Sequence, residues 1–149
     1  EKFSHRIQLT ERVHFARIEV GGPANWQQAI EERLGGKPHL VLLAYALHHF
    51  PDPKQILAAL SGFLPPGALL VINEENPKSP LFQLKHLIRG CLQKDTDVEW
   101  HRSEAAWRTL LVETGYQPGT PARGFDLLPG WELLTPALCW SLVFTARRV

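Results

Sequence analysis

The sequence has 149 residues, the size of one domain, and its 44% apolar and 21% charged residues are typical of a globular protein rather than a disordered one. Sixteen basic side chains stand against fifteen acidic ones, a formal net charge of +1, so charge gives no reason to expect a nucleic acid or an anionic membrane as a partner. The two cysteines, Cys91 and Cys139, lie far apart and form no ligand spacing. This argues against a disulfide framework and a structural zinc site, and favours a reducing, cytoplasmic setting.

The ends of the chain raise the question of completeness. No apolar run approaches the roughly 20 residues that span a bilayer, and the start has no signal-peptide pattern. The chain begins with Glu1 and contains no methionine, so we expect either a piece of a longer polypeptide or a chain from which some residues are absent. No repeat or linker divides it, and residues 1–149 are expected to form a single, partial domain.

The first predicted elements alternate between strand and helix. Residues 13–20 are rich in β-forming side chains and predict a strand that ends at the glycines that follow. Asn25 can cap a helix over 26–34, in which apolar side chains recur every four residues until two glycines end it. The apolar run 40–47 does not alternate with polar residues, and it predicts a strand buried on both faces, as in a parallel sheet.

A second helix and a second buried strand follow. Asp52 is expected to cap a helix that Pro53 opens and that the Pro-Pro-Gly turn at 65–67 ends. Residues 68–73 predict another strand buried on both faces. The order strand, helix, strand, helix, strand with short turns predicts an α/β doubly wound sheet with right-handed crossovers.

The rest of the chain predicts two helices and two strands. The helix that begins at Ser79 is expected to turn its apolar residues inward (Leu81, Leu84, Leu87, Ile88, Cys91 and Leu92) and its polar residues outward (Lys85, His86 and Arg89). Ser103 is expected to cap a helix that runs to about Thr114, with Trp107, Leu110 and Leu111 inward and Gly115 at its end. The segments 124–128 and 139–146 have no helix between them, which predicts an antiparallel C-terminal pair on a Rossmann-like, mostly parallel sheet.

Polar residues that follow the strands are the candidates for chemistry, because ligands bind at the carboxyl ends of the strands in an open α/β sheet. His48 and His49 would point to opposite faces of extended backbone, so no metal site is expected. One of them is either a packed, hydrogen-bonded histidine or a side chain that contacts a ligand or acts as a base. Glu74 and Glu75 end a strand, and at most one of them can point into the crevice, to orient a substrate group or to cap the next helix.

Several other patterns are absent or weaker. The chain has no dinucleotide-binding or Walker glycine loop and no nucleophile elbow, so neither a kinase nor a hydrolase is expected. Trp100 and His101 stand beside a polar stretch and are a candidate lid over a pocket.

Residues 39–76 carry a resemblance to a known family. Ala-Leu-His-His-Phe-Pro-Asp at 46–52 is followed by Leu-Pro-Pro-Gly-Ala-Leu-Leu at 64–70 and by the strand Val-Ile-Asn-Glu at 71–74. This succession resembles the second half of a class I S-adenosylmethionine-dependent methyltransferase. The pattern Trp107, Leu110, Leu111, Gly115-Tyr116 and the terminal 140–147 resemble the penultimate helix and last strand of that family.

The sequence also departs from the family. The glycine-rich cofactor loop and the acid that ends the second strand of the family are not in this chain, His39 stands where Asp is usual, and Ala68 replaces the second glycine of the turn. The resemblance therefore implies a sheet that is incomplete on its N-terminal side. Either the strand at 13–20 pairs directly with 40–46, or a missing segment or a partner chain fills the gap.

The resemblance implies S-adenosylmethionine as cofactor and methyl transfer to a small-molecule or carrier-bound acceptor. The balanced charge leads us to expect no nucleic acid or membrane partner. By resemblance, Ala44, Tyr45, Leu47 and His48 would line the methionine side of the cofactor, Glu19 and Trp26 the adenine side, and His49 and Glu74 would serve as the catalytic residues. The alternative is a methyltransferase-like interaction or structural module that lacks the cofactor loop and catalyses nothing.

Overall fold

The computed structural model describes residues 26–92, 100–124, 139 and 141–149. The elements in chain order are α2 (Trp26–Leu34), β1 (Leu40–Ala44), the 3-10 turn η1 (Leu47–His49), α3 (Pro53–Phe63), β2 (Leu69–Glu75), α4 (Pro80–Leu92), α5 (Glu104–Glu113), β3 (Tyr116–Pro118), β4 (Ala122–Gly124) and β5 (Ser141–Arg148). The strand predicted at 13–20, which contains Glu19, lies outside the described residues.

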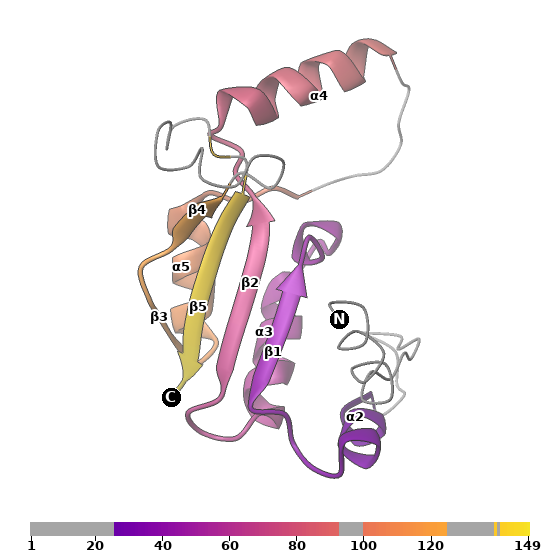
Figure 1. Cartoon of the computed structure of the whole chain (residues 1–149), viewed down its shortest axis with the longest axis vertical. Coiled ribbons are helices and arrows are strands. Elements are labelled where there is room, and N and C mark those ends of the chain that lie inside the picture. Colours follow the sequence, from indigo (N-terminus) through magenta and orange to yellow (C-terminus); the bar gives the residue numbers. More distant parts are fainter. Residues whose placement is uncertain (1–25, 93–99, 125–138, 140) are drawn as a thin grey trace, which may run out of the picture.

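The strands of the described chain form one sheet of five strands in the order β1-β2-β5-β3, and β4 also pairs with β5. β1 and β2 are parallel, whereas β5 runs antiparallel to β2, β3 and β4 (Figure 1). This confirms the predicted α/β sheet with an antiparallel C-terminal pair. The first strand of that pair begins at Ala122, two residues before the prediction, and residues 125–138 lie outside the described part. The short β3 was not predicted, because three residues that include Pro118 carry almost no strand signal.

Local chemistry sets the ends of the two helices that cover the sheet. The Asp52 side chain accepts a hydrogen bond from the backbone N–H of Lys54, and Pro53 opens α3, as predicted. Ser103 caps α5 by accepting from Ala106 N–H. Gly115, at φ +84°, takes the left-handed conformation that ends α5.

The core lies between these helices and one face of the sheet. α3 and α5 both lie behind the sheet in the view of Figure 1. Their buried side chains meet those of the strands in one cluster, whose larger members are Leu57, Leu60, Phe63, Leu70, Ile72, Trp107, Leu111 and Phe144. Burial of this apolar surface is the main favourable term in the free energy of folding.

The opposite face of the sheet is open in the described part of the chain. Leu40 and Leu42 of β1 are 60% and 62% exposed, and Thr145 and Arg147 of β5 are exposed on the same side. The expectation that 40–47 is buried on both faces is therefore wrong for this structure. Side chains alternate across a strand, and a single layer of helices covers only every second one.

The orientation of α4 also differs from the prediction. Leu84, Leu87 and Ile88, expected inside, are 51%, 66% and 49% exposed, whereas Lys85 and His86, expected outside, are half-buried. The reason is that α4 does not cover the sheet face: it lies beyond the carboxyl end of β2 (Figure 1). There its neighbours are polar side chains, and Phe82, 5% exposed, supplies the apolar contact. Among the described residues, no helix is long and apolar enough to cross a membrane.

Candidate active site at the carboxyl ends of β1 and β2

Glu74, the penultimate residue of β2, is a buried carboxylate at the centre of the candidate site. It is 1% exposed, and its Oε1 accepts hydrogen bonds from the backbone N–H groups of Ala46 at 3.1 Å and Leu47 at 2.7 Å. Its Oε2 lies 2.6 Å from Nδ1 of His48. Three donors therefore meet one carboxylate, which is how a buried charge is made tolerable.

His48 is the second member of the pair. The residue is 5% exposed, and its carbonyl oxygen accepts from the N–H of Trp100, which connects the segment before α5 to the turn η1. With the carboxylate ionised and the ring neutral, Nδ1 of His48 donates to Glu74 and the lone pair is on Nε2. A neutral imidazole held in this tautomer by a carboxylate is an oriented proton acceptor.

The chain enters the turn η1 through a conformation that is unusual for a side-chain-bearing residue. Tyr45 has φ +50°, the left-handed region, and its N–H donates to the carbonyl of Asn73 at 2.8 Å. Such backbone costs of the order of 1 kcal/mol or more and is enriched at functional sites. Ala44, the last residue of β1, is exposed beside it.

The prediction that the two adjacent histidines point to opposite faces is wrong. Both belong to the 3-10 turn, and their ring centroids lie 4.2 Å apart, with His49 exposed and His48 buried. The alternation rule applies to extended backbone, and the strand ends at Ala44, before these residues. Alternation does hold at the end of β2, where Glu74 meets His48 and Glu75 meets Lys85.

The other predicted cofactor residues are Leu47, Trp26 and Glu19. Leu47 is 1% exposed and belongs to the core, so its side chain anchors the turn rather than lining a cleft. Trp26 packs edge-on against Phe63 at 5.8 Å and also lines a cavity of about 360 Å³ between α2 and the start of α3, together with Phe50 and Ile56. Glu19 lies outside the described residues.

The sequence did not predict that His101 contacts His48. The His101 ring stacks on that of His48, with centroids 5.1 Å apart and planes inclined by 27°. The sequence marked His101 only as part of a lid, because fifty-two residues separate it from His48 and no spacing rule joins them.

Comparison with solved structures identifies the fold. An O-methyltransferase family protein from Burkholderia thailandensis superposes with a TM-score of 0.59 at 18% identity over 99% of this chain and 39% of that one. A methyltransferase from Mesorhizobium loti, described as S-adenosylmethionine-dependent, gives 0.56 at 17% identity over 75% and 62%. Magnesium protoporphyrin IX methyltransferase from Synechocystis, solved with bound S-adenosylhomocysteine, gives 0.53 at 18% identity over 83% and 58%.

The described part of the chain therefore has the fold of the class I S-adenosylmethionine-dependent methyltransferases, as the resemblance at 39–76 predicted. The chain spans less than two thirds of the length of each of these structures. No family model and no curated protein sequence matches it.

Proposed function

We propose that this chain is part of an S-adenosylmethionine-dependent methyltransferase that acts on a small-molecule or carrier-bound nucleophile. The observation that carries the proposal is the buried His48–Glu74 pair at the carboxyl ends of two parallel strands. In an open α/β sheet this edge is where ligands bind. The fold that the chain shares with methyltransferases also supports the proposal.

The residues present suit the methionine side of the cofactor. Ala44 is small and exposed at the end of β1, and Tyr45 turns the chain away through its positive φ, so both sit where a ligand can approach the backbone. Leu47 anchors the turn in the core, and Trp26, beside the 360 Å³ cavity, is the proposed contact on the adenine side, with Glu19 as a second. S-adenosylmethionine, when bound, supplies an electrophilic methyl group on a sulfonium ion.

The pair His48–Glu74 performs the proton step. The cofactor would supply the methyl group to the acceptor, and Nε2 of His48 would take the proton that the acceptor loses. Glu74 stabilises the resulting imidazolium and fixes the ring, because its Oε1 is held by two backbone N–H groups. We assign His49, which is exposed beside the His48 ring, to the side of the acceptor. The remaining contribution is the alignment of donor and acceptor.

The test is calorimetric titration of S-adenosylhomocysteine into the protein and into two matched variants. Ala44→Trp fills the proposed site, whereas Ala58→Trp places the same bulk on another exposed alanine, in α3. Micromolar binding that is lost only in Ala44→Trp supports the proposal. Absence of binding by the folded protein would favour the non-catalytic module, and equal binding by both variants would place the cofactor elsewhere.

A further inference from the structure

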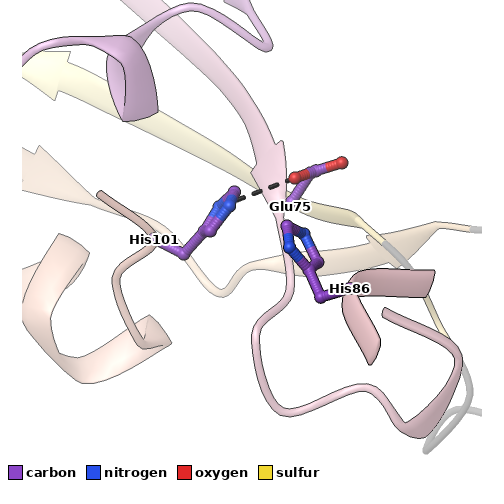
Figure 2. A group of neighbouring side chains, drawn as sticks. All are labelled: Glu75, His86 and His101. Carbon is purple, nitrogen blue, oxygen red and sulfur yellow. Dashed lines mark ion pairs between the residues drawn. The ribbon is translucent and has the colours of Figure 1, made fainter. Parts of the chain in front are cut away.

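A second polar cluster lies on the other side of the end of β2. Glu75 from β2, His86 from α4 and His101 from the segment before α5 point toward one another (Figure 2). We propose that these three residues bind a divalent transition-metal ion of the zinc class. None of the three residues has been given a role in methyl transfer, and the inference does not depend on that function.

The spacing of the ligand atoms suits one ion. One nitrogen of each imidazole and one oxygen of the carboxylate all lie within 4.8 Å of one another. His101 Nδ1 and Glu75 Oε2 are 3.5 Å apart, close to the roughly 3.4 Å that separates two ligands of a tetrahedral zinc ion with bonds near 2.1 Å. Any wider pair would have to close by at most about 1.5 Å for all three atoms to bind one ion.

The donor set selects the class of metal. Two imidazole nitrogens and one carboxylate oxygen favour zinc, iron or cobalt over magnesium or calcium, which prefer oxygen ligands alone. The side chains of Glu75 and His101 are only 8% and 12% exposed, so water competes poorly for the ion. Phe82 forms an apolar wall against both imidazoles, with ring centroids 4.1 Å from His86 and 4.7 Å from His101.

Lys85 is the competitor for this site. Its Nζ lies 2.7 Å from Glu75 Oε1, on the carboxylate that the metal would use. The lysine side chain is 32% exposed, long and flexible, so it can leave the carboxylate for solvent at a small cost. A divalent ion bound at about 2 Å attracts the carboxylate more strongly than an ammonium group does. The two cations therefore repel each other across one carboxylate, with Lys85 on Oε1 and the ion on Oε2.

Metal binding would fasten three separate segments to one point: the end of β2, the middle of α4 and the segment that leads into α5. The His101 ring also stacks on His48, so an ion on His101 would hold that ring against the buried pair. We therefore expect the metal to have a structural role and to hold α4 in place at the end of the sheet.

The experiment is a titration of Zn²⁺ into the metal-free, tag-free protein by calorimetry, with Co²⁺ absorption as a second readout. One equivalent should bind with micromolar affinity or better, raise the melting temperature, and give the visible bands of tetrahedral cobalt. His86→Ala and His101→Ala should each weaken binding at least tenfold. His39→Ala, which removes an exposed histidine outside the cluster, should change nothing.

Lys85→Ala supplies a test that misfolding cannot imitate, because the expected effect is a gain. Without its competitor, Zn²⁺ should bind several-fold more tightly. The proposal is overturned if the protein binds no Zn²⁺, if His86→Ala and His101→Ala bind it as well as the parent, or if Mg²⁺ binds as tightly as Zn²⁺. It is also overturned if Lys85→Ala weakens binding.

Discussion

Glu74 is a charged residue in a position that an apolar side chain would usually occupy. It continues the alternation of Leu70 and Ile72 along β2, on the face that α3 and α5 cover. Its carboxylate is tolerated there because Ala46, Leu47 and His48 each bring a donor to it. The residue therefore links the sheet to the turn η1 and fixes the position of the His48 ring.

Replacing Glu74 by Gln tests this role. The amide keeps the shape but loses the charge and one acceptor atom, so buried donors lose part of their hydrogen bonding, and we expect the free energy of unfolding to fall by about 1–3 kcal/mol. Urea unfolding measures the change. Glu113→Gln, on an exposed ion pair with Lys54, is the control and should leave stability almost unaltered. An equal loss in both variants would show that Glu74 has no special structural role.

Buried Tyr116, away from the candidate site, should make the stability of the fold depend on pH. Burial raises the pKa of the Tyr116 phenol to about 12. Its hydroxyl makes no hydrogen bond within the described part of the chain. The folded state keeps this proton at a pH at which the unfolded chain releases it. The protonated phenol therefore contributes fully to the free energy of unfolding below pH 10, and this contribution is lost as pH rises from about 10 to about 12.

Tyr116→Phe should therefore unfold at nearly the same urea concentration as the parent at pH 7, and it should resist alkali better. The difference in the free energy of unfolding should grow to about 2 kcal/mol near pH 12. Urea unfolding at pH 7 and between pH 9 and 12 measures this. If both proteins lost the same free energy of unfolding between pH 9 and 12, Tyr116 would not be the group responsible.

At the scale of elements, a glycine within α3 and the glycine that ends α5 should respond in opposite ways to alanine. Gly115 ends α5 at φ +84°, and an added Cβ would lie 3.0 Å from Ser61 Oγ. Gly62 lies within α3, where an added Cβ meets nothing within 4 Å. Gly115→Ala should lower the free energy of unfolding by about 1–2 kcal/mol, and Gly62→Ala should raise it by about 0.5–1 kcal/mol.

Thermal or urea unfolding of the two variants decides the point. If Gly115→Ala were as stable as the parent, α5 would not need the left-handed conformation for its ending. If Gly62→Ala lost stability, the space beside α3 would be filled.

The elements were predictable where the signal is local. The caps Asp52 and Ser103 and the stop at Gly115 depend on neighbours in sequence, and all three stand as predicted. The orientation of α4 was not predictable, because periodicity tells which residues share a face but not what that face meets.

In the site, too, local signals were predictable from the sequence and tertiary contacts were not. Glu74 and the two histidines were identified as candidates at the strand ends, yet their pairing depends on where β1 stops, a boundary that the apolar run from 40 to 47 conceals. His101 joins them only through the tertiary fold.

For the whole molecule, the sheet has one covered face and one open face in the described residues. Leu42 lies on the open face and Ile72 on the covered one. Leu42→Ala should therefore cost well under 1 kcal/mol, whereas Ile72→Ala should cost about 2–5 kcal/mol because it leaves a cavity in the core. Urea unfolding of this chain measures both. A loss at Leu42 as large as that at Ile72 would show that a further segment covers the open face.

The central claim is that the cofactor binds at the end of β1, beside His48 and Glu74, and a crystal structure of the protein with S-adenosylhomocysteine tests it most directly. The account predicts the homocysteine part against Ala44 and Tyr45, with its sulfur on the side of His48 Nε2. S-adenosylhomocysteine bound away from this edge of the sheet, or none bound at a saturating concentration, would contradict the account.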